Sequence, residues 1–189
     1  MRASRARAGR CRDETMPTTD ANSPWIVRDE QPCDLQQVRD VNEAAFGRSD
    51  EAALIDRLRA EQAVLLSLVA EHQGQIIGHI LFSRMTVETA QASISAVSLA
   101  PMAVLPDHQG RHVGSELVRR GLARLRERGE RIVIILGHEH YYPRFGFSSE
   151  KARCLASPFP PGAFMALELS DDALAGVRGT VRYPSAFGL

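Results

Sequence analysis

The chain has 189 residues, of which 44% are hydrophobic, and this is enough to bury one substantial core in a single domain. Its 23 basic and 23 acidic side chains cancel to a formal net charge of zero, so no overall field attracts nucleic acid or an anionic membrane. The longest apolar stretches, residues 64–70 and 132–137, fall far short of the roughly 20 residues that cross a bilayer. We therefore expect neither a nucleic-acid partner nor a membrane span.

Three cysteines, Cys11, Cys33 and Cys154, stand far apart in the sequence. Their odd number and wide spacing fit neither a disulfide framework nor a metal site of the CxxC type. We therefore expect no metal, and we expect the protein to work in a reducing cytoplasm. Cys154 lacks an adjacent histidine, so we interpret it as a small apolar side chain rather than as a reactive thiol.

The N-terminal segment, residues 1–23, differs in composition from the rest of the chain. It shows no apolar periodicity and carries five arginines within its first twelve residues. Such a composition is typical of a disordered extension, and the segment lacks the continuous apolar region of a secretory signal. We expect the folded domain to cover residues 24–189, and Met16 is a second candidate for the start of translation.

The first half of the domain predicts a strand, two surface helices and an antiparallel hairpin. The strand is expected over residues 25–28, and Asp34 and Asp50 are expected to cap helices with one apolar face each. Those faces carry Leu35, Val38, Val41, Ala45 and Phe46 in the first helix and Leu54, Ile55 and Leu58 in the second. Two β-rich runs, residues 64–71 and 76–85, flank a turn that contains glycine and predict the hairpin.

The second half predicts a strand, a helix and a parallel strand. The first strand, residues 93–105, ends at Pro106, which has no N–H to donate to a sheet. After a turn at residues 109–114, apolar residues repeat at helical spacing until Gly129. Residues 132–136 form an uninterrupted apolar run, which is typical of a buried parallel strand and completes a βαβ unit.

The last part of the chain adds a short helix near Tyr141, a strand over residues 163–169 and an extended piece over residues 179–183. In the predicted arrangement, antiparallel strands outnumber parallel ones. The predicted fold class is α/β (α+β), a mixed, mostly antiparallel central sheet with one βαβ unit, flanked by helices.

Two segments carry a family resemblance. Residues 102–115, with the sequence MAVLPDHQGRHVGS, resemble the acetyl-CoA signature of GNAT N-acetyltransferases, a strand followed by Gln/Arg-x-x-Gly-x-Gly/Ala and a helix. Gln109 and Gly114 fit, whereas His112 stands where the family usually has its first glycine. Residues 141–147, YYPRFGF, resemble the second signature, aromatic-Tyr-x-x-x-Gly-Phe. With the Gly-His pair at residues 137–138 and GTVRYP near the end, the chain resembles the YhbS-like branch of the GNAT superfamily over residues 26–187.

The first signature suits the pyrophosphate of CoA. A tight turn that runs into a helix presents free backbone N–H groups and the positive end of the helix dipole. Small residues at Gly110 and Gly114 let the backbone approach the phosphates, and Arg111 is able to add a screened contact. At His112, a Cβ at a position that usually holds glycine either clashes with phosphate or forces a positive φ, and histidine tolerates the left-handed backbone region better than most residues. We expect it to weaken CoA binding rather than abolish it.

The resemblance also implies a V-shaped opening beside the strand that precedes this turn. There the backbone of Met102, Ala103 and Val104 binds pantetheine, and an N–H faces the thioester oxygen, where negative charge grows during attack. The residues implied in acetyl-CoA binding are therefore Met102, Ala103, Val104, Gln109, Gly110, Arg111, His112, Val113, Gly114 and Ser115.

For the chemistry, the resemblance implies that Tyr142 is the general acid that faces the CoA sulfur, and that Tyr141 occupies the aromatic packing position. The general base is not assigned, because the strand over residues 93–104 contains no Asp or Glu. His138, Glu139 and His140 follow the next strand and are candidates. The expected activity is transfer of an acetyl group to a primary amine of a small molecule or peptide, by direct attack on the thioester.

One alternative stays open at this point. A non-catalytic acyl-CoA-binding regulatory module would keep the CoA cleft and lose turnover, and His112 and the absent strand carboxylate support it. Tyr142 argues against it. The oligomeric state is also open, and a homodimer is compatible with the sequence.

Overall fold

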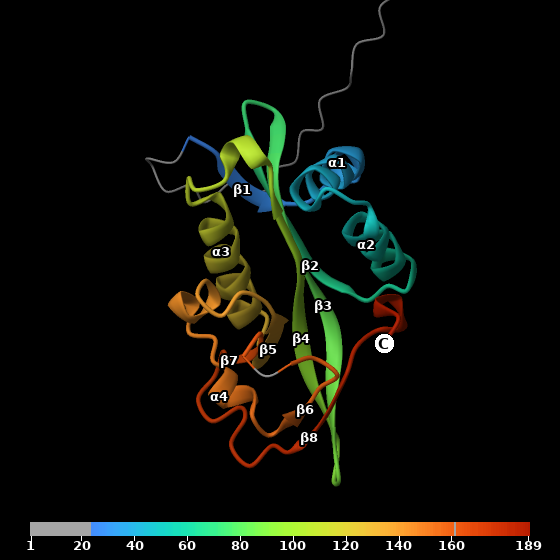
Figure 1. The fold of residues 1–189 in the computed structure, drawn as a ribbon, viewed down its shortest axis with the longest axis vertical. Coiled ribbons are helices and arrows are strands. Elements are labelled where there is room, and N and C mark those ends of the chain that lie inside the picture. The colour runs from blue at the N-terminus through green and yellow to red at the C-terminus, as the bar shows by residue number, and fades with distance from the viewer. Residues whose placement is uncertain (1–23, 161) are drawn as a thin grey trace, which may run out of the picture.

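The computed structural model describes residues 24–160 and 162–189 (Figure 1). Residues 1–23, for which we predict a disordered extension, lie outside the described part, so that prediction and the domain boundary at residue 24 stay predictions. The strands are β1 (Ile26–Asp29), β2 (Val64–His72), β3 (Gln75–Thr89), β4 (Ser93–Val104), β5 (Ile132–Leu136), β6 (Leu155–Ala156), β7 (Phe164–Glu168) and β8 (Gly179–Arg182). The helices are α1 (Leu35–Phe46), α2 (Asp50–Ala60), α3 (Val113–Glu127) and α4 (Ser149–Ala152), with short 3-10 turns η1 (Pro32–Asp34), η2 (Pro106–His108), η3 (Tyr142–Phe145) and η4 (Ser185–Phe187).

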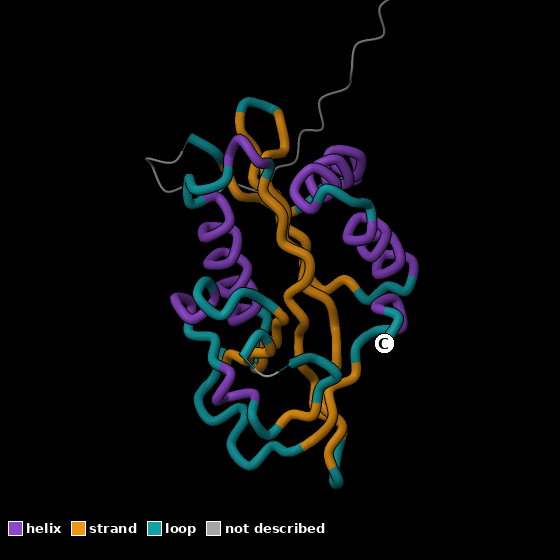
Figure 2. The backbone as a smooth tube through the Cα atoms, viewed as in Figure 1, coloured by secondary structure: helices purple, strands orange, loops and turns teal. Residues whose placement is uncertain are grey.

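The strands form one sheet in the order β1-β2-β3-β4-β5-β7, and β8 adds to β3 (Figure 2). All pairs are antiparallel except β4 with β5 and the short pair β6 with β8. The unit β4-α3-β5 is therefore the predicted βαβ unit, and the predicted fold class is confirmed. The long strand β3 pairs with β4 along one edge, and along its other edge its first part pairs with β2 and its last residues, 86–89, pair with β8.

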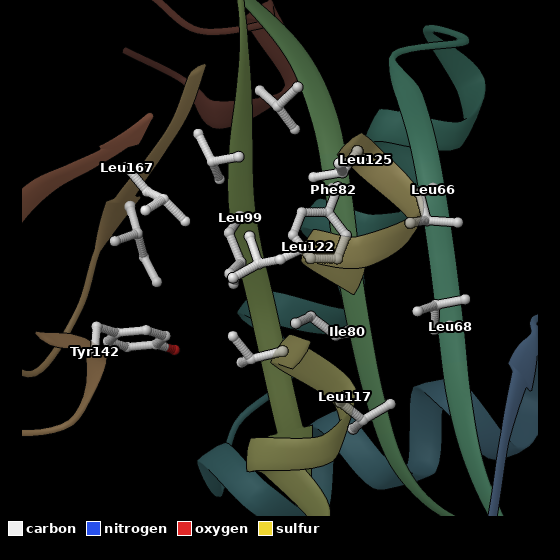
Figure 3. Close-up of a cluster of buried hydrophobic side chains, with 14 of the residues drawn as sticks. Leu66, Leu68, Ile80, Phe82, Leu99, Leu117, Leu122, Leu125, Tyr142 and Leu167 are labelled. Atoms are coloured by element: carbon white, nitrogen blue, oxygen red, sulfur yellow. The ribbon is translucent and has the colours of Figure 1, made fainter. Parts of the chain in front are cut away.

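Helices cover both faces of the sheet. Alternate residues of β3 point to opposite faces, so Ile80 and Phe82 pack with α3 whereas Leu81 packs with α1 and α2. Figure 3 shows the α3 side of the core, where Phe82 and Leu99 meet the apolar stripe of that helix. α3 lies close to the sheet because Gly121 faces Phe82, and a Cβ at Gly121 would come within 2.4 Å of that ring.

A chain of buried polar side chains joins α1 to the sheet on the other face. The Asn42 amide donates to Nδ1 of His79 at 3.2 Å, and Nε2 of His79 lies 2.9 Å from Oγ of Ser67. Ser67 donates in turn to Glu30, which also pairs with Arg59. These contacts assign the neutral Nε2–H form to His79, and burial lowers the pKa of this ring from its ordinary value.

Two predicted helix caps differ from the structure. Asp34 stands at the N-cap of α1, but its carboxylate accepts hydrogen bonds from Arg28 and from the Gln31 N–H instead of capping the helix. The Arg28 guanidinium binds both oxygens of this carboxylate through two charge-assisted bonds, so the ion pair prevails over the cap. α2 begins at Asp50 with Ser49 as its N-cap, one residue earlier than predicted. α4 and β6 have no counterpart in the sequence prediction.

Candidate functional site

The candidate site begins where β4 and β5 separate. The two strands pair only at Val97 with Val133 and at Ser98 with Ile134. Beyond Ser98, β4 continues to Val104 without β5 beside it. On its other edge, β5 pairs with β7 along its whole length. Within the described residues, this edge of β4 has no further strand partner, so a V-shaped opening separates the ends of the two strands.

Backbone groups of β4 face this opening at alternate positions. The Leu105 N–H donates to the Ile77 carbonyl of β3 at 2.9 Å, so Leu105 and Ala103 direct their backbone groups toward β3. Met102 and Val104 therefore direct theirs toward the opening. The side-chain amide of Gln109 donates to the Val104 carbonyl at 3.0 Å, which agrees with that direction. The Met102 N–H is thus a fixed donor at the opening.

The turn after β4 presents the start of α3 to the same region. Gly110 and His112 both have left-handed φ values, +72° and +68°. His112 is the N-cap of α3, and its carbonyl accepts the first helical hydrogen bond, from the Glu116 N–H at 3.0 Å. The N–H groups of residues 113–115 therefore have no partner inside the helix, and they lie at the positive end of its dipole. Of the two alternatives for His112, the structure has the left-handed backbone.

The structure brings together nine of the ten residues implied in acetyl-CoA binding. Met102, Ala103, Val104, Gln109, Gly110, His112, Val113, Gly114 and Ser115 all line one cavity of about 1000 Å³. Arg111 is exposed and is not among the lining residues. Ala103 borders the cavity, although its backbone groups face β3 and its side chain is buried against α1 and α2.

Gly114 also has neighbours that require a small residue. A Cβ at this position would lie 3.1 Å from the Tyr141 hydroxyl, 3.4 Å from Met102 Cε and 3.5 Å from Val104 Cγ2. The glycine therefore lets the start of α3 pack closely on three side chains of the site. At Gly110 a Cβ would meet no protein atom within 4 Å, and the positive φ of this residue favours glycine.

Tyr142 also lines the cavity, from the 3-10 turn η3. It is 7% exposed, and its ring packs edge-on against Tyr141 and Phe147. Gly137 makes room for it, since a Cβ there would lie 2.3 Å from the tyrosine ring. In Figure 3 the hydroxyl points toward β4, the strand that carries Leu99. Burial raises the pKa of this phenol, so at neutral pH it is protonated and able to donate.

Tyr141 has a packing role at the start of α3. Its hydroxyl lies 3.3 Å from Oγ of Ser115, and the guanidinium of Arg144 stacks on its ring at 4.6 Å. These contacts tie η3 to the first turn of α3. The two neighbouring tyrosines therefore differ in environment, because the Tyr142 hydroxyl has no hydrogen-bond partner within the described residues.

Of the candidate bases, His138 and His140 line the cavity, whereas Glu139 does not. Glu139 is exposed and lies 3.6 Å from His140. A carboxylate that the sequence analysis missed, Glu51 of α2, lines the cavity from the opposite side of the sheet. Arg48 pairs with Glu51 and holds the pKa of its carboxyl below the ordinary value.

Apolar and aromatic side chains line the remaining part of the cavity. They are Ala45 and Phe46 of α1, Leu54 of α2, Phe159 after β6, and Tyr183 and Phe187 after β8. The sequence analysis missed them as site residues because they come from four separate segments. Only the pairing of β8 with β3 and the return of the chain to α2 bring them together.

Comparison with known proteins gives the family. Residues 27–149 match the family model described as an acetyltransferase (GNAT) domain. This chain belongs to the GNAT acetyltransferase family. It is 34% identical to the uncharacterized N-acetyltransferase YhbS of Escherichia coli (strain K12) over 165 residues, which cover 86% of this chain and 98% of YhbS. It is also 43% identical to the uncharacterized N-acetyltransferase YjhQ of the same organism, over 116 residues, 60% of this chain and 64% of YjhQ.

Two solved structures agree with this assignment. E. coli YhbS in complex with CoA superposes with a TM-score of 0.82, at 34% identity over 90% of this chain and 96% of that one. A GNAT family acetyltransferase from Brucella melitensis in complex with acetyl-CoA gives a TM-score of 0.73, at 38% identity over 86% and 97% of the two chains. The predicted membership of the GNAT superfamily and the likeness to YhbS are confirmed.

Two further findings concern residues 24–160 and 162–189. No group of three or more His, Cys, Asp or Glu side chains there could hold a metal ion. None of the helices in these ranges has the length and apolar character that a bilayer span requires.

Proposed function

We propose that this protein is an acetyl-CoA-dependent N-acetyltransferase that transfers the acetyl group to a primary amine by direct attack on the thioester. The observation that carries the proposal is a single cavity with three parts. They are the free N–H groups that begin α3, the open edge of β4 with its Met102 N–H, and the buried hydroxyl of Tyr142.

Acetyl-CoA fits the residues that are present. The N–H groups of residues 113–115 suit a pyrophosphate, and the backbone of Met102 and Val104 suits the amide groups of pantetheine. YhbS and the Brucella melitensis protein were solved with CoA and acetyl-CoA respectively, which supports the same use here. Acetyl-CoA would supply an acetyl group activated as a thioester. We propose that all ten residues implied by the signature hold it, with Arg111 contributing least because it lies outside the cavity lining.

Two donors would act on the reacting atoms. The Met102 N–H is fixed by the pairing of β4 with β3, so it stabilises growing charge on the thioester oxygen without reorganisation. The Tyr142 hydroxyl is held protonated by burial and assists departure of the sulfur. Most of the rate gain comes from holding amine and thioester side by side, which contributes several kcal/mol without any acid or base.

The incoming amine has to lose a proton, since an alkyl ammonium has a pKa near ~10.4. His138 and His140 line the cavity and are exposed, so they connect it to bulk water. We propose that the proton leaves by this route. Glu139 is removed from the candidates because it does not line the cavity.

A thiol-release assay separates this function from a non-catalytic acyl-CoA-binding module. The purified protein is incubated with acetyl-CoA and each member of a panel of primary amines, and free CoA thiol is followed with time. Amine-dependent release supports an enzyme. Tight acetyl-CoA binding by calorimetry, with thiol release at the level of the protein-free control for every amine, supports the binding module instead.

A further inference from the structure

The end of the cavity away from α3 has a composition of its own. It is bordered by the junction of α1 and α2 and by the C-terminal segment, and most of its side chains are apolar or aromatic. Phe46 and Leu136, 40% and 45% exposed, are two of the four large hydrophobic side chains left exposed in the described part of the chain. Both line this cavity. Exposed apolar side chains that gather in one concave site indicate an apolar ligand.

The aromatic wall is held in place by contacts of its own. The Tyr183 ring lies 5.8 Å from Phe159 and 4.9 Å from Phe187, measured between ring centroids. The C-terminal segment is tied to α2, because Arg57 Nε donates to the Ala186 carbonyl at 2.9 Å and Ser185 Oγ donates to Glu61 at 2.7 Å. Figure 1 shows this segment running from β8 to the end of α2. Because these contacts already hold the side chains of the wall, little conformational entropy is lost there when a ligand binds.

The charge of this end comes from one ion pair, so its net charge is small. Glu51 is the one carboxylate among the described residues that line the cavity, and its side chain is 14% exposed. Arg48, which pairs with it, does not line the cavity. One ionised carboxylate suits one ammonium group, whereas a polyamine or another polycation would need several carboxylates to replace its hydration.

We infer that the acceptor is a primary amine that carries a single positive charge and an aromatic or bulky aliphatic group. The apolar group lies against Phe46, Tyr183 and Phe187, and the ammonium end lies beside the Glu51 carboxylate, which it shares with Arg48. This inference rests on the proposed function, because it takes the same cavity as the site of acetyl transfer.

The test compares three amines as probes: 2-phenylethylamine, ethylamine and spermidine. In the thiol-release assay, kcat/KM for 2-phenylethylamine is expected to exceed that of the other two amines by at least about tenfold. A tenfold ratio corresponds to roughly 1.4 kcal/mol of free energy, which we attribute to the apolar contacts. A second readout is calorimetric binding of 2-phenylethylamine to the protein saturated with CoA, where no acetyl group is present and turnover does not occur.

The matched variants are Phe46→Ala and Leu35→Ala. Both residues belong to α1 and are similarly exposed, 40% and 43%, but Leu35 does not line the cavity. Phe46→Ala is expected to weaken 2-phenylethylamine binding to the CoA complex by about tenfold or more. Leu35→Ala is expected to keep the parent value, and both variants should keep the acetyl-CoA affinity of the parent.

The possible outcomes separate this inference from the proposed function. The inference is overturned if the protein prefers ethylamine or spermidine, or if Phe46→Ala leaves the affinity for 2-phenylethylamine unchanged. The proposed function still holds in both cases as long as an amine causes release of CoA thiol. Absence of thiol release with every amine overturns the proposed function. In that case there is no acceptor, and this inference is overturned with the proposed function.

Discussion

Replacing Tyr142 by Phe tests the role of one hydroxyl at the centre of the site. The substitution keeps the ring that packs against Tyr141 and Phe147. The hydroxyl has no hydrogen-bond partner within the described residues, so its removal breaks no internal bond. We therefore expect the folded structure and the acetyl-CoA affinity of Tyr142→Phe to match those of the parent.

The size of the effect on turnover follows from the environment of the phenol. Burial raises its pKa above the ordinary value of 10.0, whereas a thiol has a pKa near ~8.5. Full proton transfer to the departing thiolate is then uphill by more than about 2 kcal/mol, so the hydroxyl acts mainly as a hydrogen-bond donor to the sulfur. A hydrogen bond to a charged group is worth about 1.5–3 kcal/mol, which predicts a fall in kcat of about 10- to 150-fold.

The assay is steady-state thiol release with an accepted amine, at saturating and at limiting acetyl-CoA. The loss should appear in kcat rather than in KM for acetyl-CoA, because the hydroxyl matters chiefly as charge grows on sulfur. Tyr141→Phe is the matched control and should turn over like the parent. If Tyr142→Phe also turns over like the parent, the reasoning about this hydroxyl is wrong. If only Tyr141→Phe is impaired, the motif is assigned one residue out of register.

Three further predictions concern the turn, the start of α3 and the buried polar chain. His112→Gly relieves a left-handed backbone, so acetyl-CoA affinity by calorimetry should be equal or tighter; a loss above about tenfold would show that the imidazole contacts the cofactor. Gly114→Val crowds Tyr141, so it should weaken CoA binding and, at a cost of about 1–3 kcal/mol, lower the melting temperature; an unchanged melting temperature would contradict the packing described. Burial lowers the pKa of His79, whose charged neighbours are Glu30 and Arg59. As the pH falls below 6.5, this histidine therefore binds a proton in the unfolded chain before it does so in the folded protein. The free energy of unfolding should therefore fall below that pH in denaturant titrations, and the slope should be shallower in His79→Gln.

The sequence predicts most of the CoA end of the site because the signals there are local. Proline and glycine positions mark the end of β4 and the turn, and the helical repeat after the turn predicts α3. The place of His112 in the signature makes a positive φ one of two alternatives, and the structure has it. The same local signals misplace the start of α2 by one residue and miss the ion pair of Asp34 with Arg28, because a cap and a tertiary contact compete for one carboxylate.

The acceptor end could not be predicted from the sequence. Phe46, Glu51, Phe159, Tyr183 and Phe187 are up to 141 positions apart, and each one fits an ordinary helix or loop by itself. They meet because β8 pairs with the far end of β3 and because η4 packs on α2. Gly114 shows the same limit, since its contact with the Tyr141 hydroxyl joins two motifs that a sequence shows only as separate patterns.

The most direct test of the central claim is the fate of a carbon-13 label in the acetyl group of acetyl-CoA. The protein is mixed with labelled acetyl-CoA and an accepted amine, and the products are read by mass spectrometry and NMR. Direct attack at the β4–β5 opening predicts that the label appears on the amine nitrogen as an amide, in an amount equal to the free CoA released, with none on the protein. Label recovered as acetate, or attached to a side chain of the protein during turnover, would contradict the account.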